Sequence, residues 1–143
     1  MPPGKAELRR TMDEARRALS ADEHRRRSEA ICRRLVEYTG LTERGAAART
    51  IMAFMPFRGE ADVVPFLQRL WETGHRILLP RTEPARGAMA LHYVTSPDEL
   101  VRGRWGIPEP PAHLPVWDGT DPIDLVLVPG LAFDRKGGRL GYG

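Results

Sequence analysis

Hydrophobic positions in the first forty residues follow the spacing of two helices. Near the start, apolar residues recur every three or four positions, at Leu8, Met12, Ala15 and Leu19. This spacing places one apolar stripe on a helix and predicts a helix over residues 5–19. Ser20 and Glu23 form a capping-box pattern, in which the serine covers an amide and the glutamate reaches back. A second helix is therefore predicted from Ala21 to Gly40.

Short apolar runs in the middle of the chain predict the strands of a sheet. Residues 50–54 form one buried strand and residues 75–80 another. Between them an apolar face predicts a helix that opens at residues 60–62, where two carboxylates in the first turn suit the helix dipole. A strand, a helix and a strand in this order make a βαβ unit, whose strands are expected to run parallel.

The second half of the chain adds strands around an irregular segment. Residues 89–94 alternate in polarity and predict a strand near a sheet edge, and residues 96–100 predict a single helical turn. Residues 104–121 are rich in proline, which excludes a central strand and predicts a long loop. The apolar run over residues 125–128 predicts a last strand, stopped by Pro129 and Gly130.

Composition places few further limits on the protein. The 143 residues predict one domain, 1–143, and a net charge of +3 suits an anionic ligand without selecting one. Cys32 is the only cysteine, which excludes an internal disulfide, and we expect it to be an inert core residue. No signal peptide or membrane span is evident, so we expect a cytoplasmic protein. The histidines lack metal-ligand spacing, and we expect solvated positions for all of them: His24, His75, His92 and His113.

The last nine residues combine glycines with cations. Glycines leave backbone N–H groups free to converge on an anion, and Arg135, Lys136 and Arg139 supply charge of the matching sign. Such a loop after a strand of an open α/β sheet is a typical ligand site. The alternative is a surface hairpin whose glycines only turn the chain. Composition alone gives both interpretations equal weight.

Other candidate residues each have a functional and a structural interpretation. Lys5 and Arg9 lie four positions apart on one helix face and can address the same phosphate, or they belong to a solvated basic face. Glu60 can accept hydrogen bonds from an N–H-rich heterocycle beside the apolar wall of Met55, or the two residues serve the helix start and the core. Trp105 can stack on a planar ligand, or it anchors a loop.

The closing segment resembles a known family. Pro129-Gly-Leu-Ala-Phe-Asp134, followed by Gly138-Arg-Leu-Gly-Tyr-Gly143, is similar to the signature of the 5-formyltetrahydrofolate cyclo-ligases. The likeness extends to the Lys5-x-x-x-Arg9 pattern, to the pair Pro80-Arg81 and to the segment from Trp105 to Pro110. Thr82 departs from the pattern, because some members have an aromatic residue there.

The resemblance implies a fold and a reaction. The fold is α/β, a three-layer α/β/α arrangement with a mainly parallel open sheet and two N-terminal helices. The reaction is the cyclisation of 5-formyltetrahydrofolate, with or without a polyglutamate tail, to 5,10-methenyltetrahydrofolate, dependent on ATP and Mg, with release of ADP and phosphate. Phosphoryl transfer to the formyl oxygen precedes attack by N10, a scheme that needs cations and amides rather than a protein nucleophile.

The resemblance also implies roles for individual residues. The expected ATP-binding residues are Lys5, Arg9, Arg139, Gly141, Tyr142 and Gly143. The expected folate-binding residues are Met55, Glu60 and Trp105. In the family the signature continues with a glycine, an aromatic pair and an aspartate, which lie beyond the sequence given. We therefore expect a domain that is incomplete at its C-terminus, with its catalytic and metal-binding residues beyond Gly143. A polypeptide that ends at Gly143 is expected to bind its ligands weakly and to turn over little. We also expect a monomer.

Two alternatives remain open at the level of sequence. The runs Arg25–Arg27 and Arg33–Arg34 could follow a phosphate backbone, as in a nucleic-acid-binding module. No recognition motif accompanies them and acidic residues nearly balance the basic ones, so we expect neither a nucleic acid nor a membrane as partner. The other alternative is a sugar-phosphate or CoA-type enzyme on a similar scaffold, because a fold does not determine its chemistry.

Overall fold

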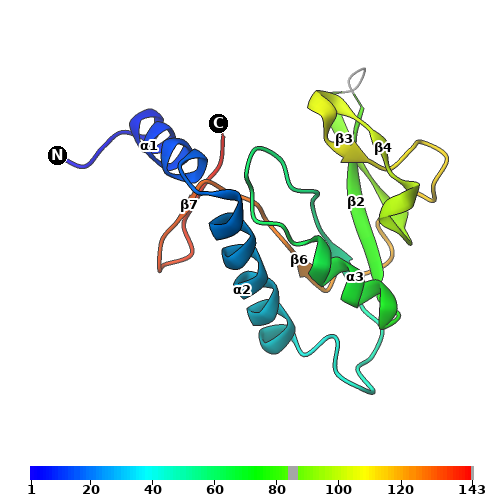
Figure 1. The fold of residues 1–143 in the computed structure, drawn as a ribbon. Helices are drawn as coiled ribbons and strands as arrows, with labels where there is room; N and C mark the ends of the chain where they lie inside the picture. Colours follow the sequence, from blue (N-terminus) through cyan, green and yellow to red (C-terminus); the bar gives the residue numbers. More distant parts are fainter. Residues whose placement is uncertain (84–86, 143) are drawn as a thin grey trace.

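The computed structural model describes residues 1–83 and 87–142, which form an α/β fold (Figure 1). The helices are α1 (Lys5–Arg17), α2 (Ala21–Thr39) and α3 (Val64–Glu72), with short 3₁₀ turns η2 (Pro97–Glu99) and η3 (Arg104–Gly106). The strands are β1 (Thr50–Met52), β2 (Arg76–Glu83), β3 (Ala88–Val94), β4 (Val101–Arg102), β5 (Pro108–Glu109), β6 (Leu125–Val126), β7 (Ala132–Phe133) and β8 (Arg139–Leu140).

Four strands form the main sheet, in the order β3-β2-β1-β6. β1 pairs in parallel with both β2 and β6, whereas β3 pairs antiparallel to β2 at an edge. The parallel β1–α3–β2 unit and the edge position of β3 confirm the predictions for these strands. Because three parallel strands end at the same edge, the loops that follow them lie together there.

Local signals explain the ends of α2. The Ser20 side chain accepts a hydrogen bond of 3.0 Å from the amide of Glu23, and Gly40 ends the helix at φ 63°, a conformation that favours glycine. The second hydrogen bond of the expected capping box, from the Ser20 amide to the Glu23 carboxylate, was wrongly predicted. The Glu23 carboxylate binds the side chains of Arg26 and Arg27, at 2.7 and 2.9 Å, where we expected it to reach back to Ser20.

The core lies between the sheet and the helices α2 and α3. Phe66, Leu67 and Leu70 of α3 are fully buried against Ile51 of β1 and its neighbours in β2. Cys32 of α2 joins this cluster with 8% of its surface exposed, as expected for a small core residue. Burial raises the pKa of the Cys32 thiol, which therefore stays protonated.

The start of α3 differs from the prediction. The helix begins at Val64, so Glu60 and Asp62 lie outside its first turn. The Glu60 carboxylate accepts a hydrogen bond from the Phe57 amide at 2.8 Å, and the Asp62 amide donates to the Ser28 hydroxyl at 3.0 Å. These contacts hold the segment outside a helix. The Glu60 carboxylate therefore does not serve the first turn of α3, as its position in the sequence suggested.

Two histidines are buried, so the expectation that all four are solvated was wrong. His75 is 5% exposed and His92 is 1% exposed. The His75 Nδ1 atom accepts from the Arg49 amide at 3.0 Å, and the His92 Nδ1 atom lies 2.9 Å from the Leu114 carbonyl oxygen. Backbone groups partner both ring nitrogens of His75, and the Arg81 Nε atom donates to the His92 Nε2 atom at 3.2 Å. These partners make burial of a polar ring tolerable.

The segment after β6 forms a short hairpin of β7 and β8. The Asp134 carboxylate accepts hydrogen bonds from the amides of Lys136 and Gly138, at 2.8 and 2.7 Å. The hairpin interpretation therefore describes the local structure, and the amides at its tip are occupied by Asp134. Within residues 1–83 and 87–142, no helix has the length and apolar character that a bilayer crossing requires.

Candidate functional site

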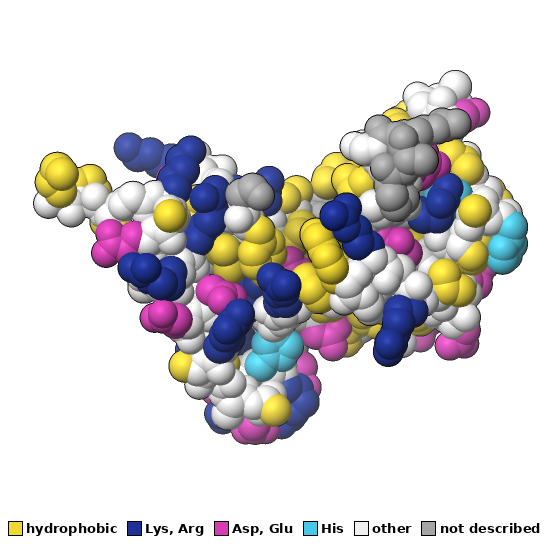
Figure 2. Space-filling model, turned by 90° about the horizontal axis from the view of Figure 1, so that it is seen from above, with side chains coloured by type: hydrophobic (Ala, Val, Ile, Leu, Met, Phe, Trp, Pro, Cys, Tyr) yellow, Lys and Arg dark blue, Asp and Glu magenta, His cyan; other side chains and the backbone are white. Residues whose placement is uncertain are grey.

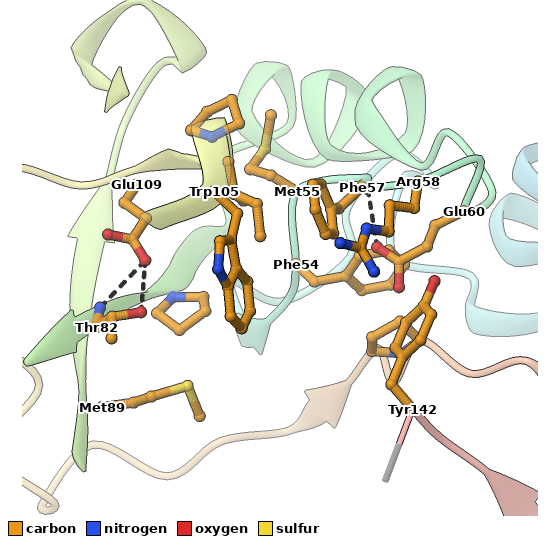
Figure 3. A pocket seen from close by; sticks show the side chains of 14 residues that line it. Phe54, Met55, Phe57, Arg58, Glu60, Thr82, Met89, Trp105, Glu109 and Tyr142 are labelled. Atoms are coloured by element: carbon orange, nitrogen blue, oxygen red, sulfur yellow. Dashed lines mark hydrogen bonds between the residues drawn. The ribbon is translucent and has the colours of Figure 1, made fainter. Parts of the chain in front are cut away.

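A cavity of about 530 Å³ lies at the edge where β1, β2 and β6 end. Its walls come from the loop after β1, from β2 and from the β4–β5 segment, and Tyr142 closes one end (Figure 3). The three residues expected to bind folate, Met55, Glu60 and Trp105, all line this cavity. The structure thus brings together side chains that are separated by up to fifty positions in the sequence.

Glu60 is a buried residue of the cavity wall. Only 7% of its surface is exposed, although its carboxylate lines the cavity. Burial raises the pKa of Glu60, while the Phe57 N–H and the positive charge of Arg16 act in the opposite direction. A carboxylate in this setting is a strong hydrogen-bond acceptor with a fixed orientation.

Trp105 is an exposed residue of the cavity wall. It lies in η3 at φ 58°, and 67% of its surface is exposed. Its indole stacks on Phe57 at 13° with 6.4 Å between ring centroids, and the Arg104 guanidinium lies 4.4 Å from its ring centroid. The indole therefore faces the cavity rather than the core. Met55 serves both interpretations, because it lines the cavity and also packs against the core.

Glu109 is a cavity residue that sequence reasoning missed. Its Oε1 atom accepts from the Thr82 hydroxyl at 2.7 Å and from the Thr82 amide at 3.2 Å, which ties β5 to β2 (Figure 3). A Cβ atom on Gly103 would overlap the Glu109 carboxylate, so the loop before Trp105 closes tightly over it. The pairing joins residues 27 positions apart, which local spacing does not reveal.

The two ends of the chain meet beside the cavity. The Arg9 Nε atom in α1 donates to the Gly141 carbonyl oxygen at 2.9 Å, and α1 lies near β7 and the C-terminal end of the trace (Figure 1). Lys5 is exposed one helical turn before Arg9. Arg139 donates to the Pro129 carbonyl oxygen at 2.9 Å. The last expected ATP-binding residue, Gly143, lies outside the described residues.

Arg16 is a second residue that sequence reasoning missed. Its Nη1 atom donates to the Tyr142 hydroxyl at 2.6 Å, and its Nη2 atom donates to the Gly130 carbonyl oxygen at 2.8 Å. In the sequence it reads as one more surface cation of a basic helix. Because Tyr142 also lines the cavity, Arg16 links the terminal segment to the candidate folate site.

The surface around the cavity has a mixed character. Figure 2 shows hydrophobic side chains gathered in a hollow of the surface, with Lys and Arg side chains on both sides of it. In the part of the chain that the structure describes, no group of three or more His, Cys, Asp or Glu side chains is arranged to hold a metal ion. Apolar walls with flanking cations suit a planar organic ligand that carries negative charge.

Comparison with known proteins gives a consistent result. The model of the 5-formyltetrahydrofolate cyclo-ligase family matches residues 2–143. The chain is 31% identical over 129 residues to 5-formyltetrahydrofolate cyclo-ligase of Escherichia coli (strain K12), covering 90% of this chain and 69% of that protein. It is 34% identical over 148 residues to the enzyme of the same name from Mycolicibacterium smegmatis, covering 99% and 72%.

A solved structure resembles this fold along nearly its whole length. The structure of Aquifex aeolicus 5,10-methenyltetrahydrofolate synthetase superposes with a TM-score of 0.80 at 32% sequence identity, covering 97% of this chain and 67% of that one.

Proposed function

This chain belongs to the 5-formyltetrahydrofolate cyclo-ligase family, and from that membership we propose that its cavity binds 5-formyltetrahydrofolate while the adjoining chain ends bind ATP. The observation that carries this proposal is the position of Tyr142. It directly follows Gly141, contacts α1 through Arg16, and lines the same cavity as Glu60 and Trp105. A ligand in the cavity and a nucleotide at Gly141 would therefore be neighbours.

Glu60 is assigned to the pterin ring of the substrate. A pterin presents N–H donors along one edge, and the oxygens of a buried, oriented carboxyl group are matched acceptors for them. Trp105 supplies a flat apolar face for the ring system, and Met55 fills the wall behind it. The carboxylate fixes orientation, whereas the aromatic and thioether groups supply contact area.

Arg9, Lys5 and Arg139 are assigned to the triphosphate. Arg9 donates through Nε to the Gly141 carbonyl oxygen, and a guanidinium carries further N–H donors on its terminal nitrogens, which we assign to phosphate oxygens. Backbone amides at Gly141 and Gly143 are assigned to the same phosphates. We assign the Asp134-bound amides at the hairpin tip no part in this cradle.

The proposed reaction has two steps. The formyl oxygen attacks the γ-phosphorus of ATP, which forms a P–O bond and releases ADP. N10 then attacks the formyl carbon and loses its proton, and the C–O bond breaks to release phosphate and leave the methenyl bridge. Both steps depend on alignment and on neutralising phosphate charge, which the cations of α1 and β8 supply. Mg is expected from the family resemblance, and we assign no Mg ligand among the described residues.

Arg25, Arg26 and Arg27 of α2 are assigned to the protein surface rather than to a nucleic acid. Arg25, Arg26 and Arg27 each form an ion pair with a carboxylate of their own helix, from Asp22, Glu23 or Glu29. Charges that are neutralised in this way contribute little to binding of a phosphate backbone.

Ligand-dependent thermal unfolding tests the proposal. Mg-ATP and 5-formyltetrahydrofolate should each raise the melting temperature, whereas sugar phosphates and CoA should leave it unchanged, because a ligand stabilises only the state that binds it. Arg139→Ala should lose most of the shift with Mg-ATP and keep the shift with folate. Lys136→Ala removes a charge from the same hairpin and should keep both shifts. Stabilisation by sugar phosphates, or no response to folate, would contradict the proposal.

A further inference from the structure

The Arg16 guanidinium joins three segments that are far apart in the sequence. It donates to the Tyr142 hydroxyl at 2.6 Å, to the Gly130 carbonyl oxygen at 2.8 Å and to the Arg58 carbonyl oxygen at 3.3 Å. Its central carbon also lies 5.9 Å from the centroid of the Tyr142 ring. A planar group with several donors in fixed directions is suited to hold acceptors from different segments at once.

The stem of Arg16 is constrained as well as its head. A Cβ atom on Gly59 would lie 3.0 Å from the Arg16 Cδ atom and 3.1 Å from its Cγ atom, so the aliphatic chain packs directly on the Gly59 backbone. Gly59 itself has φ 75°, which favours glycine. The side chain therefore runs across the loop that connects β1 to α3 before it reaches the terminal segment.

Each contacted segment carries a different part of the proposed site. The loop at residues 58–60 positions the buried carboxylate of Glu60 (Figure 3). Gly130 belongs to the segment after β6, and Tyr142 directly follows Gly141, which is assigned to the nucleotide. Arg16 lies on the same helix as Arg9, which is assigned to the phosphates. One side chain thus contacts the backbone or side chain of both halves of the site.

We propose that Arg16 is a positioning residue that couples the two ligands, so that occupation of the folate cavity tightens binding of the nucleotide and the reverse. This inference rests on the proposed function. A ligand that orders the loop at residues 58–60 orders the acceptor of Arg16, and through Arg16 it orders Tyr142. The second ligand then binds to a segment that has already lost its conformational freedom, which is the physical origin of positive coupling.

Calorimetric titrations measure this coupling directly. The protein is titrated with Mg²⁺ and a non-hydrolysable ATP analogue, alone and saturated with 5-formyltetrahydrofolate, and then in the reverse order. In the unmodified protein each ligand should tighten the other by the same factor, about 10-fold, since coupling between two sites is reciprocal. Arg16→Lys keeps the charge but loses the planar fork, and the coupling factor should fall below about 2. The affinity for each ligand alone should fall by a smaller factor than the coupling does.

Two further variants separate coupling from a general loss of structure. Arg17→Ala removes the neighbouring arginine, which pairs with Asp13 on the exposed side of α1, and the coupling factor should stay at its full value. Tyr142→Phe removes one acceptor of Arg16 and keeps the ring, and it should reduce the factor even if Arg16→Lys proves unstable on heating.

The outcomes also separate this inference from the proposed function. A coupling factor near 1 in the unmodified protein would overturn the inference while the binding of both ligands upheld the function. An unchanged factor in both Arg16→Lys and Tyr142→Phe would overturn it in the same way. If neither ligand binds the unmodified protein, the proposed function fails, and the inference fails with it.

Discussion

Glu60 and Trp105, two residues of the cavity wall, are held in opposite ways. Glu60 is 7% exposed and its carboxylate is fixed by the Phe57 amide. Trp105 is 67% exposed and lies on a short turn at positive φ. A buried, oriented carboxylate discriminates between ligands through hydrogen bonds, whereas an exposed indole adds contact area with little selectivity. The proposed function therefore predicts that Glu60 contributes more to specificity for the substrate than Trp105.

The contacts that hold the two residues also differ. The Glu60 carboxylate accepts from the Phe57 amide at 2.8 Å, and the Glu60 backbone carbonyl oxygen lies 2.8 Å from the His24 Nε2 atom. The Trp105 loop is held by the pairing of β4 with β5, by the stacking of Trp105 on Phe57 and by the hydrogen bonds of Glu109 with Thr82. The Glu109 carboxylate ties this loop to β2.

The largest effect is expected from Glu60→Ala. Loss of a buried charged acceptor should weaken 5-formyltetrahydrofolate binding about 100-fold, because the donors of the ligand would be left unpaired. Binding of the ATP analogue alone should change little. Titration calorimetry with each ligand separately measures both, and Glu37→Ala on the exposed side of α2 is the control. If Glu60→Ala binds folate as tightly as the unmodified protein, the proposed difference between Glu60 and Trp105 is wrong.

Trp105→Ala should have a smaller effect. Loss of the indole should weaken folate binding about 10-fold through lost stacking area, and Trp105→Phe should recover most of it because an aromatic face remains. The same titrations measure both variants. If Trp105→Phe binds as weakly as Trp105→Ala, stacking is not the contribution of this residue.

Glu109→Ala tests the contact that ties the Trp105 loop to Thr82. Without its carboxylate the β4–β5 loop loses its attachment to Thr82, and folate affinity should fall about 5-fold, the equivalent of one hydrogen bond. Glu109→Gln keeps an oxygen acceptor and should recover the affinity. Affinity for the ATP analogue alone should stay constant in both variants. A loss in Glu109→Gln as large as in Glu109→Ala would show that charge, not loop position, is the cause.

The smallest effect concerns pH and the burial of Glu60. Its pKa is raised above the ordinary value of 4.5, so in the window between 4.5 and the raised pKa the folded state binds more protons than the unfolded state. The contribution of Glu60 to stability is therefore present below this window and is lost as the pH rises through it. Urea unfolding at several pH values should show Glu60→Gln gaining stability relative to the unmodified protein across the same window. A constant difference would contradict the raised pKa.

Features with local causes could be predicted from the sequence. The two ends of α2 follow from Ser20 and Gly40, the parallel β1–α3–β2 unit follows from its spacing, and the closing motif identified the family. These signals lie within a few residues of the structures that they determine. The same holds for the hairpin of β7 and β8, whose turn was one of the two interpretations of the glycine-rich end.

Features that depend on distant partners could not be predicted. Arg16 reaches an acceptor 114 positions away, and the Thr82–Glu109 pair spans 27 positions. The burial of His75 and His92 depends on backbone groups of other segments, which hydrophobic periodicity does not register. Glu60 was assigned to a helix start by its spacing, but the Phe57 amide and the Ser28 hydroxyl hold its segment outside the helix. In each case a tertiary hydrogen bond overrides the local pattern.

The most direct test of the account is a crystal structure of the protein with 5-formyltetrahydrofolate and a non-hydrolysable ATP analogue. In this complex we expect the pterin ring against Trp105 with its N–H groups on the Glu60 carboxylate, and the triphosphate between Arg9 and the segment at Gly141. The two ligands should meet beside Tyr142. A nucleotide bound away from α1, or a pterin ring outside the cavity, would contradict it.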